Sequence, residues 1–286
     1  EVVGYIVDRL RKGLTPNSDV MCNKYIKFGC FEEREGHNYD RIATGHYAQT
    51  ETDEAGRVWL TTAPDPVKDQ TDFLAQLDGF SVRKLIFPVG RLVKDEVRQI
   101  AQAAHLAPAK RKDSQGICFL GKISFSELAR KYFGEKEGLV VEQETGNIIG
   151  KHKGYWFYTI GQRKGLGFGG GPWYVVRKDI KRNIIYVSRG FETKAAYGKA
   201  FRIEMPHFIT YNPYEADGDY RVTFKVRHTP EFTPGRLLVR GGKYELHSDE
   251  LIQGIAPGQF AVLYDEHAHR CLGSGEIGLL PPAKIQ

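Results

Sequence analysis

Two cysteines lie in polar turns, and each has an aspartate nearby in the sequence. Cys22 follows Asp19 by three positions in TPNSDVMCNKYIKF, and Cys118 follows Asp113 by five in KDSQGICFLG. We place Cys22 at a helix start, where the dipole and unpaired N–H groups favour a thiolate. Two such thiols are able to form a redox or sulfur-relay pair. From the pattern alone, two small buried hydrophobic side chains are the favoured interpretation.

Two further short stretches are candidates for ligand contacts. Gly45 and His46 end a predicted strand, and ligands bind at the carboxyl ends of strands in open α/β sheets. Lys68-Asp69-Gln70 opens a predicted helix, where Lys and Gln side chains suit a phosphate or a base. The alternative for Asp69 is an acid that merely complements the helix dipole. Neither stretch is specific by itself.

A glycine-rich stretch at 165–170 satisfies G-x-G-x-x-G but is not interpreted as a dinucleotide site. Such a fingerprint follows a strand and opens a helix, whereas this one leads into Pro172-Trp173-Tyr174 in β-rich surroundings. We expect a loop between strands. The preceding Gln162-Arg163-Lys164 offer donors for a phosphate backbone, and a plain glycine hairpin is the alternative.

The elements that must position these residues change character along the chain. Apolar spacing predicts helices over 1–13, from Cys22 onward with Cys22, Ile26 and Cys30 on one face, over 70–77 and over 94–106, with a buried strand over 39–49. Strands alternating with helices to about residue 120 indicate an α/β domain with a parallel sheet. Ser124-Phe-Ser-Glu127 resembles a capping box, and short β-rich segments follow Gly134.

Composition sets the broad class. The chain has 286 residues with 41% hydrophobic and 27% charged, and no run is apolar and long enough to span a bilayer. Four scattered cysteines without C-x-x-C argue against a disulfide scaffold or a zinc ribbon, and we expect no metal site. No signal peptide opens the chain, so we expect a cytoplasmic protein without a membrane partner. The net charge of +6 allows a nucleic-acid partner but does not require one.

Taken together, these stretches resemble one family, the tRNA-specific 2-thiouridylases of the MnmA/TrmU type. The resemblance covers nearly the whole chain in order. The matching stretches are TPNSDVMCNKYIKF at 15–28, ATGHY at 43–47, KDQT at 68–71, DSQGICFLG at 113–121, GQRKGLG at 161–167, APGQFAVLYD at 256–265 and CLGSG at 271–275.

The resemblance implies a fold in three parts. Residues 1–122 would be the C-terminal part of an adenine-nucleotide alpha hydrolase-like (PP-loop, Rossmann-like) α/β domain. A β-rich tRNA-binding domain over 123–199 and a C-terminal β-barrel over 200–286 would follow. The family's S-G-G-V-D-S loop, which cradles the ATP pyrophosphate, does not occur in this sequence. We therefore expect an N-terminally incomplete α/β domain that does not adenylate a substrate by itself.

The resemblance also implies an activity. ATP, with Mg²⁺, would adenylate the C2 oxygen of the wobble uridine in tRNAs for Lys, Glu and Gln, and a cysteine persulfide would supply sulfur. Cys118 would carry the persulfide and Cys22 would resolve it, leaving a Cys22–Cys118 disulfide. Asp19 would act as general base or orient the nucleophile. A persulfide-carrying protein, a relay protein or a cysteine desulfurase, would be the sulfur donor.

The family's binding residues carry over position by position. Asn17, Ser18 and Asp19 would contact the target base, and Gly45 would lie against ATP. The tRNA contacts would come from His46, Lys68, Asp69, Gln70, Arg227, His228 and Gln259. Two positions depart from the family pattern, because Ser18 stands where a proline is usual and His228 where a tyrosine is usual.

Two alternatives stay open. One is a non-catalytic tRNA-binding fragment, which the lack of the pyrophosphate loop favours. The other is a different adenylating enzyme of the PP-loop superfamily, for example one that activates a carboxylate, which the paired cysteines and the β-rich tail disfavour.

A non-reducing peptide map after mild oxidation of the folded protein tests the cysteine pair. We expect one linked peptide that joins Cys22 to Cys118, because a sulfur-transfer pair must come within disulfide reach. Both thiols remaining unreactive in the intact fold would favour two core cysteines instead.

Overall fold

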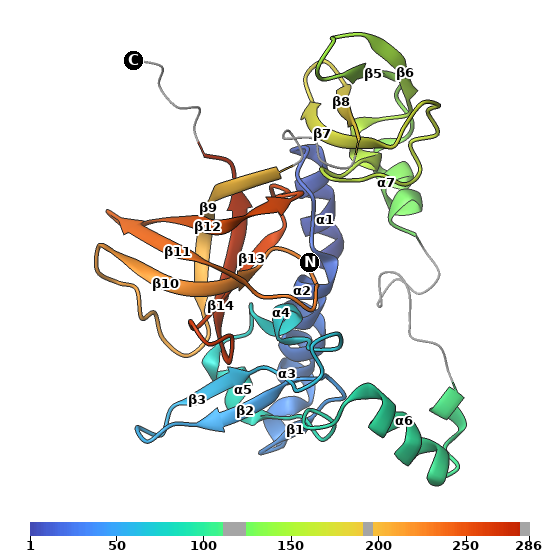
Figure 1. The fold of residues 1–286 in the computed structure, drawn as a ribbon. Coiled ribbons are helices and arrows are strands. Elements are labelled where there is room, and N and C mark those ends of the chain that lie inside the picture. Colours follow the sequence, from blue (N-terminus) through green and yellow to red (C-terminus); the bar gives the residue numbers. More distant parts are fainter. Residues whose placement is uncertain (111–123, 191–196, 281–286) are drawn as a thin grey trace.

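The computed structural model describes residues 1–110, 124–190 and 197–280. Figure 1 shows an α/β part at one end, a β-barrel beside the long first helix, and a small β-sheet unit at the other end. The α/β part comprises α1 (Val2–Arg11), α2 (Ser18–Cys22), the π-helix η1 (Asn23–Cys30), α3 (Phe31–Arg34), η2 (Gly36–Asn38), β1 (Ile42–Ala43), β2 (Gln49–Thr52), β3 (Val58–Thr61), α4 (Thr71–Leu74), α5 (Gly79–Lys84), β4 (Leu85–Ile86), α6 (Lys94–Ala103) and η3 (Ala107–Lys110).

Helix α1 confirms the prediction for the first segment. Its fully buried residues Val2, Ile6 and Leu10 are four apart and therefore share one face. The helix ends before Gly13, whose φ of +71° is a backbone conformation that glycine adopts without steric cost.

The second helical segment differs from the prediction at its start. It begins at Ser18, because the Asn17 side chain accepts a hydrogen bond from Val20 N and caps the helix there. Cys22 is therefore the last residue of α2 and not at a helix start. The predicted face of Cys22, Ile26 and Cys30 is also wrong, since Cys22 is buried while Ile26 is 38% exposed. The segment that follows Cys22 is the π-helix Asn23–Cys30, so the predicted α-helix does not continue through these positions.

The α/β part combines parallel and antiparallel pairs. In the described residues its parallel sheet consists of β1 and β4, paired at Ile42↔Leu85 and Ala43↔Ile86. The strand predicted over 39–49 is two short strands, β1 and the start of β2, separated by the loop that carries Gly45 and His46. The β2–β3 hairpin joins the barrel sheet through the Cys271↔Leu60 pair.

The second unit is a small sheet beside a capped helix. It contains α7 (Phe125–Phe133), β5 (Gly138–Glu142), β6 (Ile148–His152), η4 (Tyr155–Phe157), β7 (Trp173–Asp179) and β8 (Ile184–Arg189), with strand order β6-β5-β8-β7. The predicted capping box is confirmed, because Ser124 Oγ accepts from Glu127 N and Glu127 accepts from Ser124 N. The glycine-rich stretch 165–170 is a loop that leads into β7, which confirms that it is not a dinucleotide fingerprint.

The third unit is a closed six-stranded barrel. Its strands are β9 (Tyr197–Phe208), β10 (Gly218–Lys225), β11 (Thr233–Arg240), β12 (Lys243–Gln253), β13 (Phe260–Tyr264) and β14 (Arg270–Gly278). Closure follows because β13 pairs with both β10 and β14. Large apolar side chains such as Phe201, Phe224 and Leu237 fill its core. In the residues that the structure describes, every helix is too short or too polar to cross a membrane.

An ion pair fastens α1 to the barrel. Arg9 lies 2.6 Å from Glu276 on β14, and both side chains are largely buried. Arg9 also contacts Asp8 at 2.7 Å, but that carboxylate is 41% exposed. Loss of Glu276 would therefore leave only the exposed Asp8 carboxylate to compensate the part-buried Arg9 guanidinium.

Replacing Glu276 with alanine should lower the free energy of unfolding by about 2–4 kcal/mol, because Arg9 would remain part-buried without its partner. The matched variant Asp8→Ala should cost less than about 1 kcal/mol, since it removes an exposed pair. Urea unfolding at neutral pH measures both. Equal effects would contradict the importance of the α1–barrel pair.

Candidate functional site

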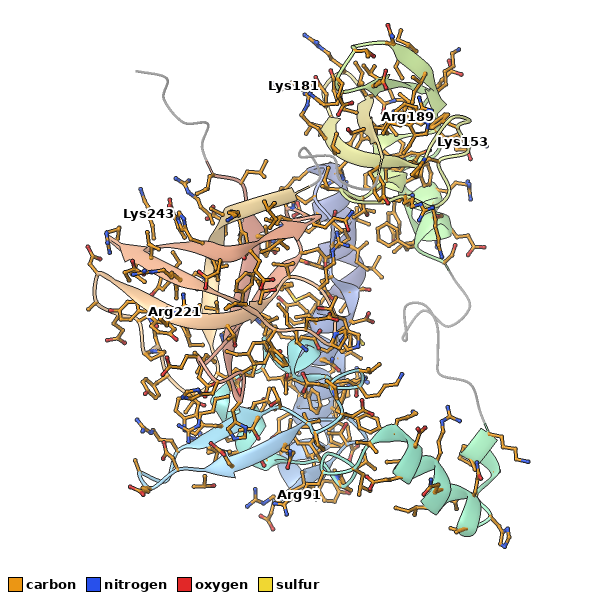
Figure 2. The ribbon with its side chains drawn as sticks, viewed as in Figure 1. Arg91, Lys153, Lys181, Arg189, Arg221 and Lys243 are labelled. Atoms are coloured by element: carbon orange, nitrogen blue, oxygen red, sulfur yellow. The ribbon has the colours of Figure 1, made fainter. Side chains whose placement is uncertain are left out.

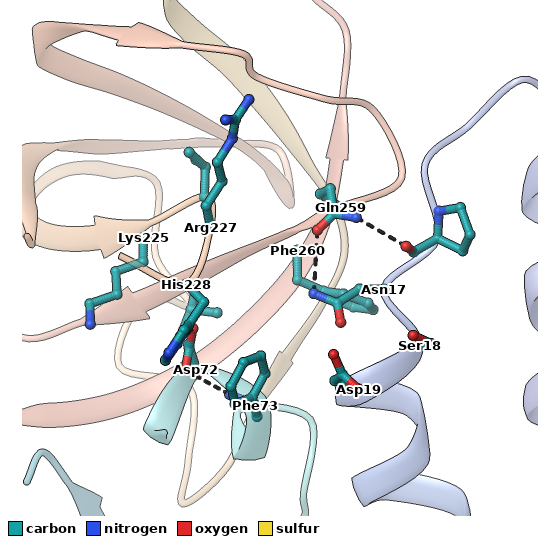
Figure 3. A pocket seen from close by; sticks show the side chains of 13 residues that line it. Asn17, Ser18, Asp19, Asp72, Phe73, Lys225, Arg227, His228, Gln259 and Phe260 are labelled. Atoms are coloured by element: carbon teal, nitrogen blue, oxygen red, sulfur yellow. Dashed lines mark hydrogen bonds and ion pairs between the residues drawn. The ribbon is translucent and has the colours of Figure 1, made fainter. Parts of the chain in front are cut away.

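A pocket of about 290 Å³ lies where the N-terminus of α2, helix α4 and the barrel meet (Figure 3). Its lining comes from four separate stretches of the chain. They are Pro16, Asn17, Ser18 and Asp19; Asp72 and Phe73; Lys225, Val226, Arg227 and His228; and Gln259, Phe260 and Val262. The three predicted target-base residues therefore share one pocket with three of the predicted tRNA-binding residues, Arg227, His228 and Gln259.

The barrel holds the first wall of this pocket in place. Gln259 Nε2 donates to Pro16 O at 3.0 Å, and its Oε1 accepts from Asn17 Nδ2 at 3.3 Å. Thr15 N donates to Pro257 O at 2.8 Å. Gly258 has φ of +88°, and a β-carbon there would lie 2.7 Å from Leu14 Cβ, so the two loops touch at a point where a side chain does not fit.

Asp19 is the acid–base candidate of the pocket. Burial raises the pKa of its carboxyl group, and the charge of Asp72 raises it further, while Lys27 and His228 act in the opposite direction. A carboxyl group with a raised pKa in a cleft can accept or deliver a proton closer to neutral pH. The geometry therefore supports acid–base chemistry or orientation of a nucleophile at this wall.

The opposite wall contains residues that sequence reasoning missed. Asp72 is buried and its Oδ2 lies 3.0 Å from His228 Nδ1. The imidazole stacks on Phe73 with ring centroids 4.6 Å apart. Asp72 and Phe73 directly follow the KDQT stretch, and Lys225 lies in the RVTFKVRH stretch, but nothing local marks them as partners. Asp72 and its partner His228 are 156 positions apart in the chain.

Arg227 connects the pocket to the unit that contains β7. Its Nη2 donates to Gly254 O at 2.8 Å. A β-carbon on Gly161 would lie 2.7 Å from the same nitrogen. The start of the GQRKGLG stretch therefore packs against the guanidinium, which brings the 161–167 loop next to the pocket.

The other four predicted tRNA-binding residues are buried or half-buried within the protein. Asp69 is buried, accepts hydrogen bonds from Ala63 N and Thr71 Oγ1, and pairs with buried Lys225 at 3.4 Å. Gln70 Oε1 accepts from Tyr47 N at 3.0 Å. His46 is buried, and Lys68 is half-buried. None of these four residues lines the pocket, and their contacts with tRNA remain predictions.

The two predicted reactive cysteines are not seen together. Cys22 is 2% exposed, lies one helical turn after Asp19 and is not among the residues that line the pocket. Cys118 lies outside the described residues, so its distance from Cys22 is not defined. Gly45 is exposed, and among the described residues other than its chain neighbours no atom lies within 4 Å of the position that a β-carbon would take there. Packing in the described structure therefore does not itself require glycine at position 45.

His46 is held as a neutral ring. Lys27 Nζ lies 3.4 Å from Nε2, and an ammonium only donates, so we assign the lone pair to Nε2 and the proton to Nδ1. Nδ1 lies 2.6 Å from Thr44 Oγ1. Burial, together with the charge of Lys27, lowers the pKa of His46 to about 4.

Basic side chains occur on all three units of the molecule (Figure 2). Figure 2 labels Arg91 in the α/β part and Arg221 and Lys243 on the barrel. It labels Lys153, Lys181 and Arg189 on the small sheet unit. In the described part of the chain, no three His, Cys, Asp or Glu side chains are grouped closely enough to hold a metal ion.

Because the folded-state pKa of His46 is about 4 and the ordinary value is 6.5, the native state favours the neutral ring. The contribution of the neutral His46 ring to the free energy of unfolding should be fully present above pH 6.5. It should fall by up to about 3 kcal/mol as the pH decreases to 4. His46→Gln should reduce this loss, as measured by urea unfolding at several pH values. An NMR titration of the His46 ring near its ordinary pKa would contradict the assignment.

Comparison with known proteins gives consistent matches along the chain. Family models match as tRNA methyl transferase HUP domain over 1–122, tRNA methyl transferase PRC-barrel domain over 126–189 and aminomethyltransferase beta-barrel domain over 198–277. A tRNA-specific 2-thiouridylase MnmA of Porphyromonas gingivalis is 62% identical over 282 residues, covering 96% of this chain and 78% of that protein. The protein of the same name from Parabacteroides distasonis is 58% identical, over 96% of this chain and 77% of the relative.

Proposed function

Because the chain belongs to the tRNA-specific 2-thiouridylase family, we propose that it replaces the C2 oxygen of the wobble uridine in tRNA with sulfur. The main support is the pocket in Figure 3, which Asn17, Ser18 and Asp19 line together with Arg227, His228 and Gln259. Its volume of about 290 Å³ is near the lower end of ordinary small-molecule sites and suits one extruded base. We propose tRNAs for Lys, Glu and Gln as substrates and the cytoplasm as the location.

The first proposed step activates the base. The C2 oxygen attacks the α-phosphorus of ATP, and pyrophosphate leaves, assisted by Mg²⁺. Gly45 is proposed to lie against ATP. Its exposed backbone, with open space where a β-carbon would be, supports close approach of a ligand.

The second proposed step transfers sulfur. The terminal sulfur of a persulfide on Cys118 attacks C2, the C–S bond forms and AMP leaves with the former C2 oxygen. The Cys22 thiolate then attacks Cys118 Sγ, which breaks the S–S bond, leaves sulfur on C2 and forms a Cys22–Cys118 disulfide. A thiol reductant restores the cysteines, and a persulfide-carrying protein reloads Cys118.

Asp19 is proposed to accept a proton or to orient the attacking sulfur. Its raised pKa and its place in the pocket lining support this role. Cys22 follows Asp19 by three positions on a continuous helix, so the two side chains lie on neighbouring parts of one face. Since Cys22 is covered in the described structure, its reaction requires local opening of the helix surroundings.

We also propose that residues 1–122 hold the reaction centre, that 123–199 and 200–286 are separate domains, and that both contact the tRNA. Basic side chains on all three units support a contact with RNA phosphates.

A non-catalytic tRNA-binding protein is the second candidate, and the burial of Cys22 is the observation that favours it.

Mass spectrometry of tRNA after incubation with ATP and a persulfide donor tests this function. When the family's pyrophosphate-binding loop, which this sequence does not contain, is supplied on the same chain, the wild-type protein should produce 2-thiouridine. Cys118→Ser in that protein should abolish it while tRNA binding stays intact, because the sulfur carrier is lost. Cys30→Ser is the matched control and should retain thiolation.

Thiolation by Cys118→Ser would overturn the persulfide assignment. A wild-type protein that binds tRNA but forms no 2-thiouridine under these conditions would favour the non-catalytic candidate.

A further inference from the structure

The Asp72–His228 pair combines a buried acid with a partly exposed imidazole. Asp72 lies on α4 with a side chain that is 6% exposed, whereas His228, just beyond the end of β10, is 38% exposed. The carboxylate contacts Nδ1 at 3.0 Å, and Phe73 supports one face of the ring. Within the described residues, no protein group forms a hydrogen bond with Nε2 of His228.

This geometry determines what Nε2 can do. An ionised carboxylate only accepts hydrogen bonds, so Nδ1 carries a proton in both charge states of the ring. In the neutral ring Nε2 is then an acceptor, which an anionic oxygen does not approach favourably. After protonation Nε2–H becomes a charge-assisted donor that binds a phosphate oxygen.

The charges around the ring favour the protonated state. The hydrogen bond to Asp72 is the largest influence and raises the pKa of His228, and the more distant Asp69 acts in the same direction. Burial and the ammonium of Lys225 on β10 act against protonation. Asp19 on α2 also interacts electrostatically with the ring. Stacking on Phe73 adds a cation–π contribution that only the charged ring receives.

We propose that Asp72 is a positioning residue that keeps the Nε2 donor of His228 directed to a phosphodiester of the bound tRNA, so that this contact forms only while the ring is protonated. The inference rests on the proposed function, because it takes tRNA as the ligand. It assigns a role to Asp72 and makes part of the tRNA affinity dependent on pH.

The sign of the pH dependence follows from linkage. A phosphate contact that needs the imidazolium is complete below the pKa of His228 in the free protein. It is lost as the pH rises through the higher pKa of the complex. A charge-assisted hydrogen bond of ordinary strength corresponds to about a tenfold weakening of tRNA binding across this range.

Dissociation constants for tRNA, measured without ATP between about pH 6 and 8.5, test the proposal. Wild-type binding should weaken about tenfold with rising pH beyond any change in the control His267→Gln, which removes an 80% exposed histidine in another loop. His228→Gln should bind weakly throughout, and His228→Tyr should bind with a flat profile, because phenol donates over the whole range. Asp72→Asn should move the midpoint to lower pH.

Salt dependence gives a second readout that a structural defect would not reproduce. At about pH 6, His228→Gln should reduce the slope of log K against log salt by roughly 0.7–0.9, the loss of one phosphate contact. At about pH 8.5 wild type and variant should have the same slope.

The outcomes separate the two proposals. No tRNA binding by the wild-type protein would overturn the proposed function. Binding whose pH profile is unchanged in His228→Gln would overturn the role of His228. A midpoint that stays in place in a folded Asp72→Asn variant would overturn the positioning role of Asp72.

Discussion

The attachment of the loop before α2 to the barrel is the constraint on which the pocket depends. Thr15 and Pro16 are tied by hydrogen bonds to the stretch that holds Pro257 and Gln259, and Gly258 lets the two backbones approach. These contacts orient the N-terminus of α2 and therefore Asp19. Because the partners lie more than 240 positions apart, the wall exists only when the α/β part and the barrel are assembled.

A buried charge pair also joins the α/β part to the barrel. Asp69, two residues before α4, and Lys225 on β10 are each almost fully buried and lie 3.4 Å apart, so each charge is compensated by the other. Lys225 also lies 4.0 Å from the centre of the Phe232 ring. This arrangement explains the internal side-chain contacts of Asp69 in a motif that the sequence suggested for RNA binding.

The pocket thus contains two titratable groups with perturbed pKa values, Asp19 and His228. Burial makes Asp19 a weaker acid, and pairing with Asp72 makes His228 a stronger base. Both pKa shifts are upward and favour the protonated form of each group, and perturbed pKa values gathered in one cleft are typical of functional sites. Burial and the charge of nearby Lys27 both keep His46 neutral.

Local patterns in the sequence determined the apolar face of α1, the capping box at Ser124 and the long motifs that identify the family, because periodicity, caps and motifs involve residues close together in the chain. The family resemblance that these motifs carry also made Asn17, Ser18, Asp19, Arg227, His228 and Gln259 candidate residues. Only the tertiary structure decided that the second helix starts at Ser18 and that Asp72 holds His228. An N-cap competes with other possible starts, and a pair 156 positions apart forms only after the units have packed.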